Sequence, residues 1–201
     1  MRRALLPLLL VPLLAACGSH GPAAITGGTS HVDVATKDLV AYKKKTDVPD
    51  CPRVAAKSAP GGMPSVTLPC LGGGRSVDVA GLRGPMIVNL WASWCEICRK
   101  EMPALASYAR GQSQVKVLGI DYSDPNPAGG LELARSSKVG YPLVADPEVQ
   151  LDHASPLPHF SGLPYTVYID ASGKVVNIEA GALRTEADVA AAAKQYLGVG
   201  G

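Results

Sequence analysis

Two cysteines separated by two residues are the strongest candidates for chemistry in this chain. Cys95 and Cys98 lie in the segment Trp94-Cys95-Glu96-Ile97-Cys98, between an apolar run and a stretch with helical periodicity. A thiolate is the nucleophile of thiol–disulfide exchange, and a helix N-terminus stabilises its charge and lowers the pKa of the thiol from about 8.5. Two intervening residues place both sulfurs on one helical turn. We therefore expect Cys95 to attack a substrate disulfide and Cys98 to resolve the mixed disulfide.

Other assignments of this cysteine pair fit the sequence less well. A structural zinc site needs a second pair of ligands, and the chain has no second Cys-x-x-Cys and no His-x-x-x-His. A haem attachment site needs His directly after the second cysteine, where Arg99 stands. No cysteine lies in the Pro-x-x-x-Thr-x-x-Cys context of peroxidases. His153 and His159 lie in a proline-containing loop without a Cys-x-x-x-Cys motif to share a copper ion, so we expect no metal site.

The segments around these cysteines predict an α/β fold. Residues 86–91 (MIVNLW) form a nearly continuous apolar run, which suits a strand buried on both faces. Strand and helix patterns alternate after it, which indicates a central sheet with helices on both faces. Gly72-Gly73-Gly74 separates two short strand patterns and indicates a β-hairpin ahead of the sheet. The expected strands are 65–68, 76–79, 86–91, 115–120, 143–145, 165–170 and 175–180, and the expected helices are 36–45, the stretch after Cys95, 128–138 and 185–197.

The N-terminus has the pattern of an export signal. Arg2-Arg3 precedes an apolar run that ends at Ala16 and is too short to span a bilayer, which takes about 20 apolar residues. We therefore expect residues 1–16 to be a signal peptide. Leu14-Ala15-Ala16-Cys17 resembles the lipobox of bacterial lipoproteins, which implies that cleavage leaves Cys17 as a lipidated first residue. The alternative is an ordinary signal followed by a coincidental cysteine.

The body of the chain is electrically balanced and holds an even number of further cysteines. Without its two leading arginines the chain has as many acidic as basic side chains. This argues against nucleic acid as a partner, because such binding needs a clustered basic face. Exported chains keep their disulfides, so the two cysteines that remain, Cys51 and Cys70, are expected to pair. That structural disulfide would close a loop of about 20 residues.

The segment of residues 88–103 (VNLWASWCEICRKEMP) resembles the signature of the TlpA/ResA family (CcsX/DsbE-type), extracytoplasmic thioredoxin-fold proteins of which many are membrane-anchored. The resemblance extends from Met63 to the C-terminal helix, so it implies a thioredoxin-like domain over residues 63–201. Ahead of it, residues 36–62 are expected to form an N-terminal helix and a loop packed on the domain. Residues 17–35 contain a Gly/Ser/Thr-rich stretch and are expected to be a lipid-anchored flexible linker.

The resemblance also assigns roles to residues away from the two cysteines. The family carries a glutamate at the position of Glu101, where it would exchange protons with the sulfurs; the alternative is a solvated helix residue. Asn89 stands where cytoplasmic thioredoxins carry a buried aspartate, and we expect it to be a hydrogen-bonded structural amide. Leu163-Pro164 matches the family's cis-proline loop, which would expose backbone to dock the substrate chain.

Trp94 and Glu96 are further candidates for contact with substrate. Trp94 is expected to flank the exposed sulfur. Glu96 resembles the glutamate between the cysteines of ResA-type apocytochrome c reductases, where it would contact substrate or tune the redox potential; plain solvent exposure is the alternative. Ile97 departs from the proline common at that position in the family, so the resemblance does not give the redox potential.

The sequence thus predicts a membrane-anchored thiol:disulfide oxidoreductase on the extracytoplasmic face of the cell membrane. We expect a monomer that needs no cofactor beyond the Cys95–Cys98 disulfide. By resemblance, its substrate would be the disulfide of apocytochrome c during cytochrome c maturation, and a CcdA- or DsbD-like membrane protein would supply electrons. One alternative is an oxidase that donates disulfides to secreted proteins, as in some exported actinobacterial relatives. Another is a copper-binding metallochaperone that uses both cysteines with His153 or His159.

Overall fold

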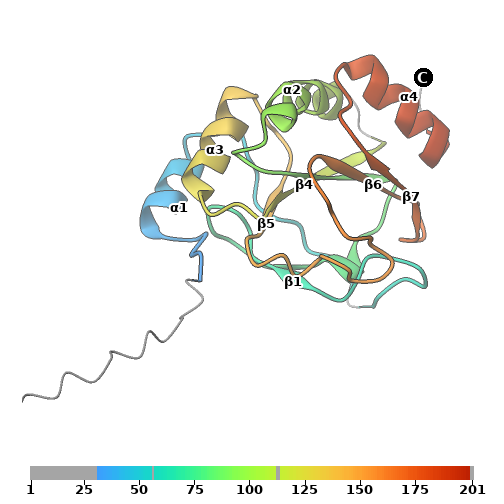
Figure 1. Ribbon diagram of the computed structural model, residues 1–201, viewed down its shortest axis with the longest axis horizontal. Coiled ribbons are helices and arrows are strands. Elements are labelled where there is room, and N and C mark those ends of the chain that lie inside the picture. The colour runs from blue at the N-terminus through green and yellow to red at the C-terminus, as the bar shows by residue number, and fades with distance from the viewer. Residues whose placement is uncertain (1–30, 56, 112–113, 200–201) are drawn as a thin grey trace, which may run out of the picture. The chain divides into compact units, whose positions relative to one another are not determined.

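A five-stranded mixed sheet forms the centre of the protein in the computed structural model, which describes residues 31–55, 57–111 and 114–199 (Figure 1). Its strands are β3 (Met86–Trp91), β4 (Lys116–Tyr122), β5 (Leu143–Asp146), β6 (Tyr165–Ile169) and β7 (Val175–Ala180). They lie side by side in the order β5-β4-β3-β6-β7. β3, β4 and β5 run parallel, whereas β6 and β7 each run antiparallel to the strand before them in this order.

Helices and a small hairpin complete the described part of the chain. Side-chain caps fix where the helices begin: Thr36 accepts a hydrogen bond from the backbone N–H of Leu39, and Thr185 forms a reciprocal capping box with Asp188. Two two-residue strands pair antiparallel ahead of the sheet. These elements are α1 (Lys37–Lys43), β1 (Thr67–Leu68), β2 (Val77–Asp78), the 3₁₀ helix η1 (Val79–Gly81), α2 (Glu96–Gly111), α3 (Pro127–Ser136) and α4 (Glu186–Leu197).

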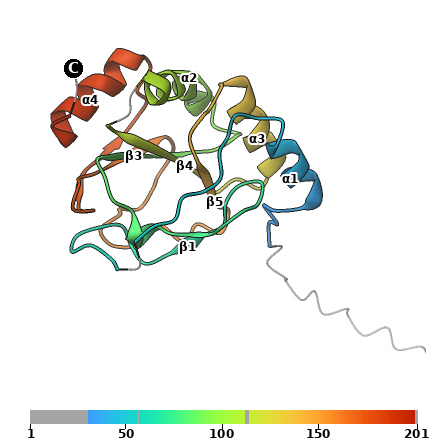
Figure 2. The same ribbon diagram turned by 180° about the vertical axis from the view of Figure 1, so that it is seen from behind.

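Alternate residues of β3 face two separate hydrophobic clusters. Ile87 and Trp91 belong to the cluster that α1, α2, α3 and α4 cover, in which Met102 of α2 is fully buried. Val88 and Leu90 face the other cluster, which the β1–β2 hairpin, η1 and the loop between β5 and β6 cover. In Figures 1 and 2 the labelled helices accordingly lie on one side of the sheet and β1 on the other.

The strands and helices lie close to the bounds predicted from the sequence, but the helices are not shared between the two faces of the sheet as expected. β3 and β7 have the predicted bounds, and α4 begins one residue after the predicted start. Among the described residues, the second face carries only the short η1 as a helix. The reason is the strand order: β3, β4 and β5 step in one direction across the sheet, and right-handed crossovers then place α2 and α3 on the same face.

The segment ahead of the sheet is fastened to it by the second cysteine pair. Cys51 and Cys70 form a disulfide with a Cα–Cα distance of 5.9 Å, as their number and spacing predict. The buried ammonium of Lys43 in α1 lies 3.2 Å from the sulfur of Cys70 and donates a hydrogen bond of 3.0 Å to the carbonyl of Gly73. Burial lowers the pKa of Lys43. Helix α1 therefore packs against the disulfide through Lys43.

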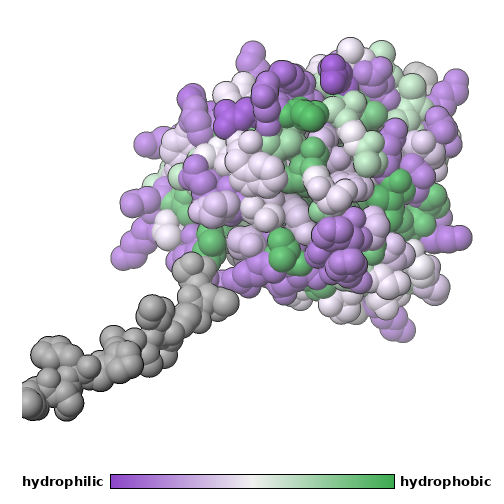
Figure 3. All heavy atoms as spheres, in the orientation of Figure 1, coloured by the Kyte–Doolittle hydropathy of each residue, from purple (hydrophilic) through white to green (hydrophobic). Residues whose placement is uncertain are grey.

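Predictions for the N-terminus concern residues that the structure does not describe. The predicted signal peptide (1–16), Cys17 and the predicted linker up to residue 30 all lie outside the described residues. Within the described ranges, no helix combines the length and the apolar character needed to cross a membrane. The face shown in Figure 3 is largely hydrophilic, with hydrophobic residues in several separate patches.

Candidate redox site

The first cysteine lies at the N-terminus of the longest helix described. Cys95 directly precedes α2, and it forms a disulfide with Cys98 over a Cα–Cα distance of 5.3 Å. The sulfur of Cys95 accepts a hydrogen bond of 3.1 Å from the backbone N–H of Cys98. That N–H is one of the four that a helix leaves without a backbone partner, and the positive end of the helix dipole lies there as well. Both effects stabilise a thiolate on Cys95 when the disulfide is reduced.

The two cysteines differ in their access to solvent. Cys98 is fully buried, whereas Cys95 is 6% exposed and adjoins the surface. Trp94, which precedes Cys95, has 56% of its surface exposed, and Ile97 is also an exposed large apolar side chain. An incoming disulfide can therefore reach Cys95 from an apolar surface, while Cys98 is reached only from inside the protein.

Three polar contacts hold the loop between β3 and α2. The backbone N–H of Ser93 donates a hydrogen bond of 2.5 Å to Oδ2 of Asp124, and the carbonyl of Ser93 accepts bonds of 3.0 and 2.5 Å from the guanidinium of Arg99. The indole N–H of Trp94 donates a bond of 3.0 Å to the carbonyl of Ser123. Both peptide groups of Ser93 are thus fixed, and with them the position of Cys95.

A buried pair of carboxyl groups lies behind this loop. Asp121 ends the register pairing of β4 with β3, opposite Trp91, and is almost fully buried, as is Asp124. Burial raises the pKa of Asp121 well above its usual range, and the neighbouring Asp124 adds to this effect. Its environment therefore favours the protonated form of Asp121. Asp124 accepts hydrogen bonds from the N–H of Ser93 and, through Oδ1, from the N–H of Asn126 at 2.9 Å.

A third buried carboxyl group follows Cys98 by one helical turn. Glu101 is fully buried, and its oxygens accept hydrogen bonds from the side-chain amide of Asn89 (3.2 Å) and the backbone N–H of Leu183 (2.9 Å). Burial raises the pKa of Glu101 to about 7, which outweighs the opposing effect of these two hydrogen bonds. Residues three positions apart are neighbours on a helix surface, so Glu101 lies on the face of α2 that carries Cys98. The solvated alternative for Glu101 is excluded by its burial.

Glu96 has a different environment, although it lies between the cysteines. It is exposed, and its carboxylate pairs with Lys100 one turn later at 2.8 Å. A hydrogen bond from Lys100 lowers the pKa of Glu96. Glu96 therefore remains ionised at neutral pH and contributes negative charge to the surface around Cys95.

An open pocket of about 290 Å³ adjoins the active-site face. Trp94 and Leu163 line it, together with residues from the end of β4 and from the loop before β6. The peptide bond between Leu163 and Pro164 is cis, as the sequence predicts. Because β6 runs antiparallel to β3, with Tyr165 opposite Leu90, the start of β6 lies at the end of β3 that leads to Cys95. The segment at Trp94 and the segment at Leu163, both predicted to contact substrate, thus meet at this end of the central strands.

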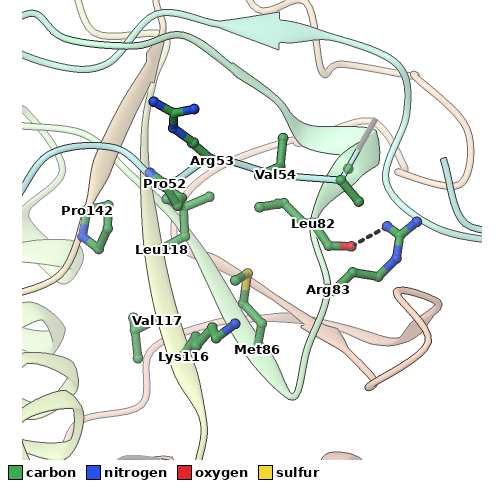
Figure 4. A pocket seen from close by; sticks show the side chains of 12 residues that line it. Pro52, Arg53, Val54, Leu82, Arg83, Met86, Lys116, Val117, Leu118 and Pro142 are labelled. Atoms are coloured by element: carbon green, nitrogen blue, oxygen red, sulfur yellow. Dashed lines mark hydrogen bonds between the residues drawn. The ribbon is translucent and has the colours of Figure 1, made fainter. Parts of the chain in front are cut away.

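A second pocket, of about 210 Å³, lies at the opposite end of β3 and β4 (Figure 4). Met86 and Lys116, the first residues of these strands, line it, and Arg53 and Arg83 come from the segments alongside. In Figure 4 the guanidinium of Arg83 is turned back toward the carbonyl of Leu82, to which it donates a bond of 2.7 Å. None of the residues predicted to take part in redox chemistry lines this pocket.

Sequence comparison assigns the chain that carries this site to a known family. Residues 61–178, which are more than half of the chain, match the AhpC/TSA family. The chain belongs to this AhpC/TSA family. It is 35% identical over 105 residues to the thiol:disulfide interchange protein DsbE homolog of Paracoccus denitrificans, covering 51% of this chain and 54% of that protein. It is 31% identical over 113 residues to the thiol-disulfide oxidoreductase ResA of Bacillus subtilis, covering 55% and 61%.

Similarity to solved structures agrees with this membership of the AhpC/TSA family. A thiol:disulfide interchange protein of the thioredoxin family from Chlorobium tepidum superposes with a TM-score of 0.54 and 25% identity, covering 70% of this chain and 99% of that one. The thioredoxin fold and the resemblance to DsbE and ResA proteins are thereby confirmed. The chain spans between half and two thirds of the length of these two curated relatives.

Proposed function

We propose that this AhpC/TSA-family protein is a thiol:disulfide oxidoreductase whose reacting atoms are the sulfurs of Cys95 and Cys98. The observation that carries the proposal is the asymmetry of the pair at the start of α2. The sulfur of Cys95 accepts the N–H of Cys98 and adjoins the surface, while Cys98 is fully buried. One sulfur is thus prepared for attack from outside and the other for resolution from inside. The names of the DsbE and ResA relatives describe the same class of activity.

In the reducing direction, two exchange steps account for all atoms and electrons. The Cys95 thiolate attacks one sulfur of a substrate disulfide, a mixed disulfide forms, and the other substrate sulfur leaves as a thiolate that takes a proton. Cys98 then gives up its proton and attacks the sulfur of Cys95, which forms the Cys95–Cys98 disulfide and releases the second substrate thiol. Two electrons pass from the protein to the substrate.

Glu101 is the proposed proton acceptor for the second step. It shares a helix face with Cys98, and its pKa of about 7 lets it hold or release a proton near neutral pH. Asn89 and Leu183 fix the carboxyl group from two sides, so it can change protonation without changing position. Trp94, Leu163 and Pro164 would contact the substrate chain at the pocket beside Cys95.

We further propose that the substrate is the disulfide of an apocytochrome c haem-attachment motif and that the protein works outside the cytoplasm. Support comes from the resemblance of the segment around Glu96 and Glu101 to ResA-type reductases. Residues 1–16 would be removed as a signal peptide, and Cys17 would carry lipid at the start of the 17–35 linker. A CcdA- or DsbD-like membrane protein would re-reduce the disulfide after each turnover. Cys17→Ala should release the protein from the membrane fraction, and a variant that stays there after a carbonate wash would refute the lipid anchor.

The opposite direction uses the same sulfurs and is therefore the second candidate function. A disulfide donor would transfer the Cys95–Cys98 disulfide to reduced secreted proteins. The reduction potential separates the two: a value near about −250 mV or below fits a reductant, and one near about −120 mV fits an oxidant. Equilibration with glutathione or dithiothreitol redox buffers measures it.

A trapping experiment tests the activity and the substrate together. Cys98→Ala removes the resolving sulfur, so substrate should accumulate on Cys95 as a stable mixed disulfide. The matched control, Cys95→Ala, should trap nothing, because the remaining sulfur of Cys98 is buried. Absence of any trapped protein would refute the oxidoreductase activity. Trapped secreted proteins without a Cys-x-x-Cys-His motif among them would keep the activity and overturn the cytochrome assignment.

A further inference from the structure

Three side chains that the redox mechanism does not use converge in the loop between β5 and β6. Within the described residues, Asp152, His153 and His159 form a group whose carboxylate and imidazole atoms lie within 4.8 Å of one another. Both histidine side chains are exposed to solvent. Carboxylate and imidazole are the donors that Zn²⁺ and related divalent ions take from proteins, with three protein ligands and one open position in sites that are not closed.

The distances around one oxygen fit such an ion. Oδ2 of Asp152 lies 2.9 Å from Nδ1 of His159 and 3.8 Å from Nε2 of His153. Ligand bonds of about 2.0–2.1 Å at tetrahedral angles put neighbouring ligand atoms about 3.3 Å apart, which lies between these two distances. The two imidazole rings stack with centroids 4.8 Å apart and an interplanar angle of 10°. Because the lone pairs of imidazole lie in the ring plane, one of these exposed rings has to rotate out of the stack for both nitrogens to face one ion.

The carboxylate of Asp152 is already oriented by a backbone hydrogen bond. Its other oxygen, Oδ1, accepts a hydrogen bond of 2.9 Å from the backbone N–H of Phe160 and lies 3.1 Å from Nδ1 of His159, so Oδ2 is the oxygen nearer to that imidazole. Hydrogen bonds of this kind to a ligand's second atom are what orient ligands in metal sites.

We propose that Asp152, His153 and His159 bind a divalent transition-metal ion of the Zn²⁺ class through Oδ2, Nε2 and Nδ1. Three ligands from one loop leave the fourth position open to water or to an incoming group. A donor set with two nitrogens favours Zn²⁺, Ni²⁺ or Cu²⁺ over Mg²⁺ and Ca²⁺, which prefer oxygen ligands.

The position of this site connects it with the redox face. Asp152 and His159 line the same pocket as Trp94 and Leu163, beside Cys95. Tyr122 lines it too. A bound ion would add positive charge to this pocket and connect the two ends of residues 152–159.

Calorimetric titration with Zn²⁺ tests the proposal on the full chain in its oxidised form, in which Cys95 and Cys98 are paired and cannot bind metal. One equivalent should bind, and His153→Ala and His159→Ala should each weaken binding at least tenfold. His31→Ala is the matched control, because His31 is exposed and pairs with Glu148 instead, and it should leave binding unchanged. Equal binding by the wild type and the His153→Ala/His159→Ala double variant, or no binding at millimolar Zn²⁺, would overturn the proposal.

Two further measurements keep the test decisive if a histidine variant is unstable. Asp152→Asn retains an oxygen for the N–H of Phe160 but loses the charge, so Zn²⁺ should raise the Tm of the wild type and not of this variant. In the wild type, Zn²⁺ should slow the modification of His153 and His159 by diethyl pyrocarbonate, read by mass spectrometry, and leave that of His31 unchanged. Equal protection of all three histidines, or of none, contradicts the site.

Discussion

The side-chain amide of Asn89 donates a hydrogen bond of 3.2 Å to Oε2 of Glu101, inside the contact between β3 and α2. Both residues are fully buried, and the amide oxygen of Asn89 has no hydrogen-bond partner. This bond favours the ionised form of Glu101, but burial has the larger effect and raises the pKa to about 7. In the folded protein Glu101 is therefore close to half-protonated at neutral pH, whereas in the unfolded protein it is ionised.

Glu101→Gln should change how the stability of the protein depends on pH. Between pH 4.5 and about 7 the folded state holds a proton on Glu101 that the unfolded state has released, so the free energy of unfolding falls as pH rises through this window. The full difference corresponds to about 3 kcal/mol. Glutamine does not titrate, and Asn89 can turn its free oxygen toward the new amide. Urea unfolding from pH 4 to 8 should therefore show a flatter pH dependence in the variant and a higher stability above pH 7.

The control for this prediction is Glu96→Gln. Glu96 is exposed and paired only with Lys100, so its loss should leave the pH dependence between 4.5 and 7 nearly unchanged. The same two variants separate the redox roles, because only Glu101→Gln should slow the resolution of the mixed disulfide and alter its pH–rate profile. Identical profiles for the wild type and Glu101→Gln would show that Glu101 takes no part in proton transfer.

The sequence predicts the cysteine chemistry and most of the elements, because these depend on local patterns. The apolar run 86–91 is β3 to the residue, and the capping box that starts at Thr185 marks the start of α4. The sequence does not reveal the hydrogen bonds from Asp124 and Arg99 that hold the backbone of Ser93. Its partner Asp124 lies 31 residues further along the chain, and only the register of β4 against β3 brings them together. From the sequence, Arg99 likewise has no feature that distinguishes it from other helix residues, and its hydrogen bond to the carbonyl of Ser93 follows only from the folded loop.

Asp124→Ala should both destabilise the protein and slow its redox reaction. The substitution leaves the buried N–H group of Ser93 without its acceptor, at a cost of about 1–3 kcal/mol, and removes a second, only partly buried hydrogen bond from the N–H of Asn126. The loop that positions Cys95 loses one of its fixed points, so exchange with a model disulfide should become slower. Chemical denaturation and stopped-flow exchange measure the two effects.

Two further variants make the Asp124 prediction specific. Asp121→Asn introduces no buried charge, and its amide can donate toward Asp124 as a protonated Asp121 would, so it should be tolerated near neutral pH. Asp47→Ala removes an exposed aspartate and should change neither stability nor rate. If Asp124→Ala were as stable and as fast as Asp47→Ala, the hydrogen bond to Ser93 would have no role in holding the loop.

Replacing both Cys51 and Cys70 by alanine should lower stability without removing the redox reaction. Their disulfide closes a loop whose ends are 19 positions apart, for which loop-closure entropy gives about 3 kcal/mol. Neither cysteine lies at the start of a helix, so no helix N-terminus stabilises a leaving thiolate there, and mild reductant that opens the Cys95–Cys98 disulfide should leave this one intact. Thermal unfolding measures the loss, and mass spectrometry after mild reduction and alkylation measures the selectivity. Labelling of Cys51 and Cys70 at the rate of Cys95 would contradict the structural role.

Alkylation of the reduced protein should occur first on Cys95, with a midpoint below the usual thiol pKa of about 8.5. The sulfur of Cys95 receives the N–H of Cys98 and the positive end of the α2 dipole, whereas Cys98 is buried beside a carboxyl group that becomes negative as pH rises. Cys98→Ser should therefore retain most of the fast labelling, and Cys95→Ser should remove it. Glu101→Gln tests the two sulfurs independently, because it removes a negative charge near Cys98 and leaves the helix N-terminus unchanged. The alkylation midpoint of Cys95 should therefore stay the same, whereas the pKa of Cys98 should fall. A shift of the Cys95 midpoint by the same amount would mean that the carboxyl group acts on both sulfurs, and that the helix N-terminus does not set the reactivity of the first.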